Sequence, residues 1–116
     1  MILDAEVFYL AERNPRRLAA LLTELTDEDF ATNEAVMAQV WRNPPRQVPI
    51  TRLLASLGVE VLPLADGRSI GVLLAQTETT DVVDASIALL ARSWNQPVLT
   101  SDPNDLQALG AITITL

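Results

Sequence analysis

The chain has 116 residues and no cysteine, histidine or lysine, so all eight of its cationic side chains are arginines, against fifteen Asp and Glu and a formal net charge of -7. This composition excludes disulfide frameworks, thiolate and imidazole catalysis, cysteine-ligated zinc, a phosphate-loop lysine and a Schiff base. What remains is the chemistry of carboxylates, hydroxyls, amides and arginines, and of the hard cations Mg²⁺ or Mn²⁺ that carboxylates bind.

Short apolar runs alternate with segments of helical periodicity along the chain. The first predicted strand, residues 1–3, ends at Asp4, and the helix after it ends near Asn14 because Pro15 disfavours helix in the preceding residue. The further predicted helices cover residues 16–25, 34–42, 48–57, 66–76, 79–92 and 102–109, and the further strands cover residues 30–32, 59–62, 97–100 and 111–115. Turn and cap signals fall at residues 27–29, Asn33, residues 43–45 and Gly58.

Strands that alternate with helices predict a three-layer α/β/α sandwich around a central, mostly parallel sheet of four to five strands. The length favours a single domain over residues 1–116, because a chain of this size buries a sufficient core without metal or disulfides. No apolar run approaches the length of a membrane span, and no basic region precedes an apolar core at the N-terminus. We therefore expect no membrane segment and a cytoplasmic location.

Acidic side chains follow the carboxyl ends of two predicted strands. Asp4 follows the first strand and Asp102 follows strand 97–100, so both reach the same rim of a parallel sheet if these strands are neighbours. Asp84 lies in the first turn of the helix that begins at that rim, and Asp81 lies one turn earlier on the same helical face. Carboxylates gathered without a lysine repel one another, and a divalent cation would neutralise them. The sequence therefore predicts an all-oxygen metal site.

Each of these acids also has a purely structural interpretation. Asp81 is first of all the acid expected at a helix start, where it complements the helix dipole. Asp102 before Pro103 is a good helix N-cap, which is compatible with a metal-binding role. For Asp4 the functional interpretation is favoured, because a lone carboxylate buried after an apolar run is costly.

Three stretches of the chain resemble the motifs of a known family: residues 2–5 (ILDA), 84–91 (DASIALLA) and 98–106 (VLTSDPNDL). They are similar to the first, third and fourth acidic motifs of PIN domains, which are metal-dependent ribonucleases and most abundantly the VapC-type toxins of bacterial toxin-antitoxin pairs. The resemblance spans essentially the whole chain, and its specific part is the last third. It implies a PIN-like fold and an endoribonuclease that acts as the toxin of such a pair.

The resemblance implies that Asp4, Asp84 and Asp102 are the catalytic and metal-binding carboxylates. With Mg²⁺ or Mn²⁺ as cofactor, a metal-activated water would hydrolyse an RNA phosphodiester bond. Asp84 or the metal-bound hydroxide would then take the proton-transfer role that histidine plays elsewhere.

Several further residues have accessory roles on the same resemblance. Either Thr100 or Ser101 would supply a hydroxyl that supports the ligands, and Asp81 and Asp105 are accessory acids. Arg42 is the predicted RNA-binding arginine. The neighbouring Trp41 would stack on a base, pack in the core or form a subunit contact, and these alternatives stay open.

The middle of the chain departs from the PIN pattern. Gln39 stands where PIN domains usually carry a glutamate, and Glu34 on the same helix lies roughly 140° away around the axis. The Gln39 carbonyl can bind a cation but brings no charge, so metal affinity should fall. Glu6 also stands where a small or hydroxyl residue is common. The alternative function is therefore a PIN-like, non-catalytic binding or regulatory protein with a weakened metal site. A phosphate-accepting receiver domain is disfavoured, since it needs a lysine at the rim.

Two protein partners are expected besides the RNA substrate. The apolar residues 7–10 and the leucines of the second helix exceed what one face of a small sheet covers, which predicts a homodimer surface or a groove for an antitoxin. The resemblance implies a cognate antitoxin protein.

Overall fold

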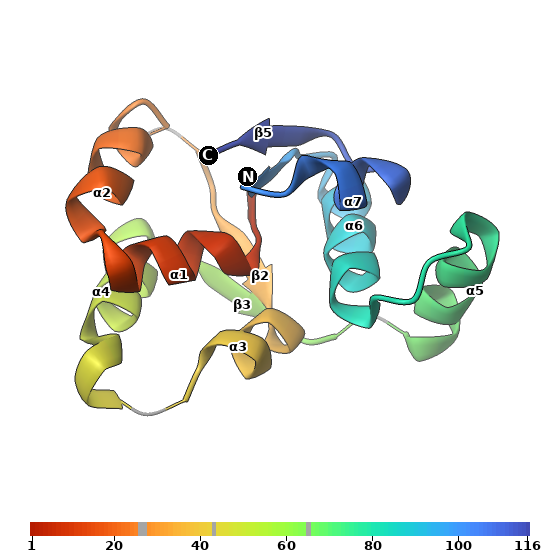
Figure 1. Ribbon diagram of the computed structural model, residues 1–116, viewed down its shortest axis with the longest axis horizontal. Coiled ribbons are helices and arrows are strands. Elements are labelled where there is room, and N and C mark those ends of the chain that lie inside the picture. The colour runs from red at the N-terminus through yellow and green to blue at the C-terminus, as the bar shows by residue number, and fades with distance from the viewer. Residues whose placement is uncertain (26–27, 43, 65) are drawn as a thin grey trace.

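The computed structural model describes residues 1–25, 28–42, 44–64 and 66–116, so residues 27 and 43 of two predicted turns lie outside the described ranges. Figure 1 shows helices on both sides of a central sheet. The strands are β1 (Ile2–Leu3), β2 (Ala31–Asn33), β3 (Glu60–Leu62), β4 (Val98–Thr100) and β5 (Thr113–Thr115). The helices are α1 (Ala5–Arg13), α2 (Pro15–Thr23), α3 (Glu34–Val40), α4 (Val48–Leu57), α5 (Gly67–Thr77), α6 (Val82–Trp94) and α7 (Pro103–Ala108), with a 3₁₀ turn η1 (Pro44–Gln47) before α4.

The five strands of the described chain form one sheet in the order β3-β2-β1-β4-β5, and every pairing is parallel. The central strand β1 pairs with β2 on one side and with β4 on the other, and Leu3 lies opposite Leu99. This confirms the predicted parallel sheet. It also confirms the neighbour relation that brings the carboxyl ends of the first and fourth predicted strands to one rim.

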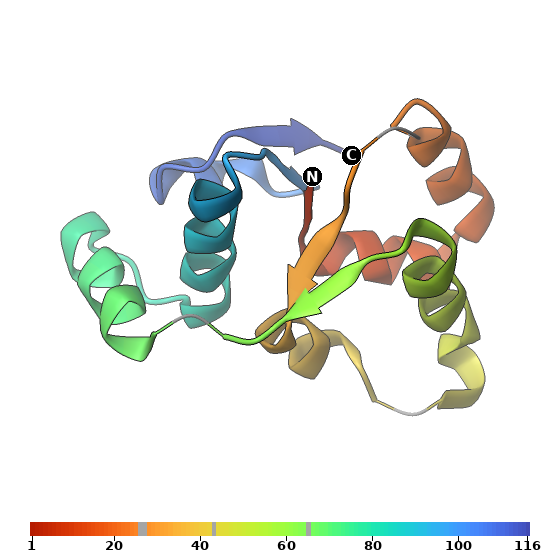
Figure 2. The same ribbon diagram turned by 180° about the vertical axis from the view of Figure 1, so that it is seen from behind.

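Helices cover both faces of the sheet, and the two opposite views in Figures 1 and 2 place α1 in front of the central strands and α6 behind them. Helix α1 packs against α2, α3 and α4, whereas α6 packs against α5, α7 and the strands β1, β2 and β4. The core between the layers includes Ile2 and Leu3 of β1, Phe8 of α1 and Ile87 of α6, all fully buried. The fold is therefore the three-layer α/β/α sandwich that the alternating pattern predicts.

Most helix ends carry the signals read from the sequence. The side chain of Asn33 accepts a hydrogen bond from the backbone N–H of Val36 at 3.0 Å and caps α3. Gly58 ends α4 in the left-handed region with φ of 60°, where a Cβ would be strained. None of the helices in the described ranges has the length and apolar character needed to cross a membrane.

Helix α3 ends two residues earlier than predicted. Trp41 follows it with an extended backbone, φ -77° and ψ 129°, so the helical path stops at Val40. Gln47, only 1% exposed, accounts for this stop: its Nε2 donates to the carbonyl of Val40 at 2.8 Å and its Oε1 accepts from the N–H of Arg42 at 2.8 Å. The side chain of Gln47 therefore binds the backbone groups that another turn of α3 would use.

Helix α6 continues two residues beyond its predicted end. It runs to Trp94 and stops at Asn95, whose φ of 52° lies in the left-handed region. Trp94 packs against the main core as the apolar residue at the end of this helix.

Candidate metal-binding rim

Asp4 is held where β1 ends and α1 begins. Its Oδ1 accepts from the N–H of Ala5 at 2.8 Å, its Oδ2 accepts from the hydroxyl of Thr100 at 2.9 Å, and the residue is only 7% exposed. Burial raises the pKa of the Asp4 carboxyl, the two hydrogen bonds lower it, and the charges of Glu6 and Asp81 raise it further. A carboxylate kept in this environment carries a desolvation cost that a nearby positive charge would offset.

Asp84 shows that the predicted acids lie close together. It is half-buried in the first turn of α6, and its pKa is raised to about 7 by burial and then by the charges of Asp81, Asp4, Asp105 and Asp102. Four carboxylates lie near that of Asp84, and no cation contributes to its pKa shift. This part of the rim is therefore strongly negative. The acids of three separate sequence segments are therefore brought to one place.

Asp102 follows β4 at the same rim and is exposed. It occupies the N-cap position of α7, but its side chain makes no capping hydrogen bond, so the capping half of its predicted role is wrong. Its backbone N–H donates instead to the Thr100 hydroxyl at 3.0 Å. The carboxylate of Asp102 is thus not engaged as a helix cap.

Thr100 joins the two ends of the predicted ligand set. The residue is fully buried, and its hydroxyl donates to Asp4 while it accepts from the backbone of Asp102. Of the two hydroxyl candidates, Thr100 makes these bonds and Ser101 is exposed. Thr100 is the last residue of the buried strand β4, whereas Ser101 lies just beyond the end of the strand.

Asp81 and Asp105 border a hollow of about 240 Å³ beside Asp84, together with Thr79, Thr80, Ala108 and Leu109. Asp81 caps α6, because its Oδ1 accepts from the N–H of Asp84 at 2.9 Å. This confirms its structural interpretation and leaves its second oxygen without a role in that bond. We call Asp4, Asp81, Asp84, Asp102 and Asp105 the acidic rim.

The chemistry of the acidic rim fits a hard divalent cation, since its donors are all oxygens and its charge is uncompensated. In the described ranges, no three acidic side chains converge into a ready ligand set. The rim is therefore a set of neighbouring carboxylates rather than a closed cage. Binding of a cation would require side-chain rotation or bridging water molecules.

The remaining predicted residues lie on α3 and α1. Gln39 is exposed, and its backbone carbonyl accepts from the Tyr9 hydroxyl at 3.4 Å. Arg42 is exposed at the end of α3, where its Nη1 donates to the carbonyls of Ala38 and Trp41. Glu6 lies close enough to Asp4 to influence its pKa. Glu34 is exposed at the start of α3.

One buried connection at the rim was not predicted. The Nδ2 of Asn33 donates to the hydroxyl of Ser86 at 3.0 Å, and Ser86 donates to the carbonyl of Val83 at 2.7 Å. This links the start of α3 to the first turns of α6, one on each face of the sheet. The helix-cap signal at Asn33 identified its Oδ1 bond, but a partner 53 residues away leaves no local signal.

Solved structures similar to this chain share its topology. The sequence matches no protein-family model and no curated protein. A structure of VapBC2 from Rickettsia felis bound to a DNA fragment from their promoter is 18% identical and covers 99% of this chain and 97% of that chain, with a TM-score of 0.73. FitAcB from Neisseria gonorrhoeae is 19% identical and covers 98% of this chain and 96% of that chain, with a TM-score of 0.65. VapC is a PIN-domain toxin.

The chain has a PIN-like fold. A structure of FitAB bound to an IR36 DNA fragment agrees, at 20% identity over 98% of this chain and 93% of that chain, with a TM-score of 0.68. These identities are low, so the likeness concerns the path of the backbone. In this PIN-like fold the acidic rim lies where the carboxyl ends of parallel strands place a site.

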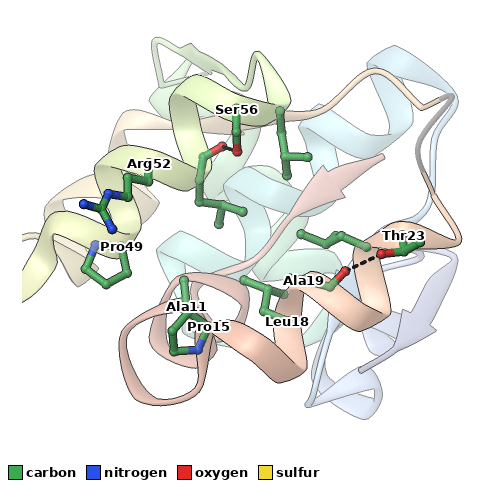
Figure 3. Close-up of a pocket in the computed structure, with 11 residues that line it drawn as sticks. Ala11, Pro15, Leu18, Ala19, Thr23, Pro49, Arg52 and Ser56 are labelled. Carbon is green, nitrogen blue, oxygen red and sulfur yellow. Dashed lines mark hydrogen bonds between the residues drawn. The ribbon is translucent and has the colours of Figure 1, made fainter.

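An apolar groove lies between α2 and α4 of this chain, and Ala11 of α1 also lines it. It has a volume of about 390 Å³, and Figure 3 shows side chains of all three helices lining it. The Thr23 hydroxyl donates to the carbonyl of Ala19 at 2.8 Å, so this wall offers little free polarity. Neither α2 nor α4 contains an acidic residue, and they carry Arg16, Arg17 and Arg52. The groove is therefore an apolar surface with Arg52 as the charged residue of its lining.

The charge on Asp84 predicts an unusual dependence of stability on pH. The folded pKa of about 7 lies above the ordinary value of 3.8, so the folded chain binds a proton that the unfolded chain does not bind between these values. The contribution of Asp84 to the free energy of unfolding therefore rises as pH falls from about 7 toward 4. Asp84→Asn should remove this dependence and raise the stability at pH 8 by on the order of 1 kcal/mol after allowance for solvent screening, about 4 °C in Tm.

Thermal unfolding by circular dichroism at pH 5 and pH 8 with EDTA measures this effect. Asp66→Asn, at the exposed cap of α5, is the matched control and should leave the wild-type pH dependence in place. A lower Tm for Asp84→Asn than for wild type at pH 8 would contradict the prediction.

Proposed function

We propose that this chain is a Mg²⁺- or Mn²⁺-dependent endoribonuclease and the toxin of a type II toxin-antitoxin pair, acting on RNA in the cytoplasm. The observation that carries the proposal is the gathering of Asp4, Asp84 and Asp102 at one rim, where mutual repulsion and burial raise the pKa of Asp84 to about 7. A carboxylate cluster of this kind is the arrangement that a divalent cation stabilises. The PIN-like fold supports the assignment.

Asp4, Asp84 and Asp102 would hold the cation. When bound, the cation supplies charge stabilisation at the attacked phosphate and lowers the pKa of water. Thr100 keeps the Asp4 carboxylate in one orientation and fixes the backbone from which Asp102 projects. Asp81 anchors the N–H of Asp84, which sets the direction of the first turn of α6. These contacts fix the Asp4 carboxylate and the backbone of the other two acids before any ligand arrives.

A second function, a PIN-like binding or regulatory protein without catalysis, is favoured by one observation. Gln39 is neutral at the position where the PIN pattern has a glutamate, and its recorded contact is through its backbone to Tyr9. A rim that lacks this charge binds a cation more weakly. Calorimetric titration with Mn²⁺ separates the two functions, because the non-catalytic protein would give no heat at millimolar metal while it remains folded.

The test of the proposed nuclease is cleavage of a mixed-sequence RNA by the purified chain in Mn²⁺. We expect cleavage in Mn²⁺ and none in EDTA. The absence of cleavage in Mn²⁺, with a folded protein that binds the metal in calorimetry, would contradict the proposal.

We further propose that the groove between α2 and α4 receives an apolar helix of the cognate antitoxin. VapBC2 and FitAB are the two-protein systems named in the similar structures, which supports a protein partner for this chain. Apolar side chains dominate the lining of the groove, and the two helices that flank it carry three arginines and no acidic residue. Acidic residues beside the apolar face of the antitoxin helix would complement them. The active form is proposed to be a homodimer.

A further inference from the structure

Trp41 is an exposed aromatic residue that the fold itself does not use. It follows α3 directly and is 38% exposed, whereas the other tryptophan, Trp94, packs against the main core. Large exposed aromatic rings bury favourably when they meet a partner. The exposure of Trp41 therefore argues against the core interpretation and makes the ring available for a contact with another molecule.

The backbone on both sides of Trp41 is fixed. Its N–H donates to the carbonyl of Met37 at 2.9 Å, and its own carbonyl accepts from the Nη1 of Arg42 at 2.7 Å. The buried Gln47 binds the carbonyl of Val40 and the N–H of Arg42, which are the groups that flank Trp41 in the chain. An aromatic ring on such a support loses little conformational freedom when it binds.

Exposed cationic residues follow Trp41 in the chain. Arg42 is exposed beside it, and its Nη1 also donates to the carbonyl of Ala38 at 3.0 Å, so the guanidinium is held at the end of α3 with other N–H donors remaining. Arg46 is exposed and pairs with Glu12 at 3.2 Å. Arg42 therefore places a cation directly after the ring in the chain.

Trp41 follows a short helix that starts at the carboxyl end of the sheet. Helix α3 begins at the carboxyl end of β2, and Figures 1 and 2 both show it at the end of the sheet where α6 begins. A helix of seven residues is about 10 Å long, so Trp41 stands roughly that far along α3 from its start. A short single strand can span this separation.

We infer that Trp41 is a stacking platform for one base of single-stranded RNA, with Arg42 binding the adjacent phosphate. The inference rests on the proposed ribonuclease function and names the contact that holds its substrate. A chain with net charge -7 gains little from general attraction to phosphates, so base stacking is the source of affinity that its composition allows. Arg42 adds a local phosphate contact without changing the sign of the whole surface.

The experiment uses Trp94→Phe, which leaves Trp41 as the one tryptophan of the chain, and short unstructured oligouridylate RNA in EDTA, which removes the cation needed for cleavage. Intrinsic fluorescence should be quenched in a saturable way as RNA is added. In anisotropy with labelled RNA, Trp41→Ala should weaken binding about tenfold, and Trp41→Phe, which keeps a ring, should stay within about threefold of its parent. Circular dichroism checks that each variant is folded.

Several outcomes overturn the inference. They are unchanged fluorescence at RNA concentrations that saturate the anisotropy, equal RNA affinity in Trp41→Ala, and no RNA binding at all. A change in sedimentation from dimer to monomer in Trp41→Ala, with RNA affinity unchanged, would assign Trp41 to a subunit contact instead. Quenching without Mn²⁺-dependent cleavage would support the stacking contact and contradict the proposed nuclease. Cleavage with unchanged fluorescence would support the proposed nuclease and contradict the stacking contact.

Discussion

Asp4→Asn is expected to lower Mn²⁺-dependent RNA cleavage about 100-fold or more. The substitution keeps the size of the side chain and removes one negative charge from the rim. Because the Asp4 carboxylate is 7% exposed and its charge is disfavoured by burial, the variant should be at least as stable as wild type. Loss of activity in a protein with an unchanged or higher Tm would therefore report on the cation site and not on folding.

Initial cleavage rates over a range of Mn²⁺ concentrations measure this effect. Asp66→Asn is the matched control, since it makes the same chemical change at the exposed cap of α5 and should keep the wild-type rate. Asp102→Asn should behave like Asp4→Asn. If Asp4→Asn cleaved RNA as fast as Asp66→Asn, the metal-binding role of the rim would be wrong.

Ala19→Arg is expected to weaken the complex with the antitoxin about 100-fold. Ala19 is an exposed alanine on the wall of the groove, so a long cationic side chain there fills the space that an apolar helix would occupy. Ala20→Arg is the matched control. Ala20 is an exposed alanine on the same helix and is not among the residues that line the groove.

The measurement is co-purification and calorimetry with the proposed antitoxin. Both variants should fold and keep their nuclease activity, because the groove is distinct from the acidic rim. Equal binding of Ala19→Arg and Ala20→Arg would show that the partner docks elsewhere.

The sequence predicted the fold well because its signals are local. Each signal depends on residues that are close together in the sequence: apolar runs, prolines at helix starts, and caps such as Asn33 and Gly58. The structure confirms the predicted elements within a few residues. The early end of α3 was missed because Gln47 acts from another turn of the chain. A side chain that satisfies distant backbone groups has no periodicity of its own.

The candidate site was predicted in outline for a similar reason. Asp4 and Asp102 follow predicted strands, and the parallel order of the sheet brings them together without knowledge of any side-chain contact. The sequence could not choose between the hydroxyls of Thr100 and Ser101, since the choice depends on the residue at which β4 ends. The Asn33 to Ser86 bond was likewise outside its reach, because it joins two layers of the fold.

The hydrogen bond between Thr100 and Asp4 joins residues 96 positions apart, and the two-residue strand β1 is held on one side by β4. During translation, β1 therefore cannot pair with β4 until residues 98–100 have been synthesised. Such long sequence separations slow folding, since loop closure precedes the gain from pairing. A nascent chain whose Asp102 has not yet left the ribosome lacks part of the acidic rim. We expect the proposed nuclease to stay inactive until the segment that carries Asp102 has left the ribosome.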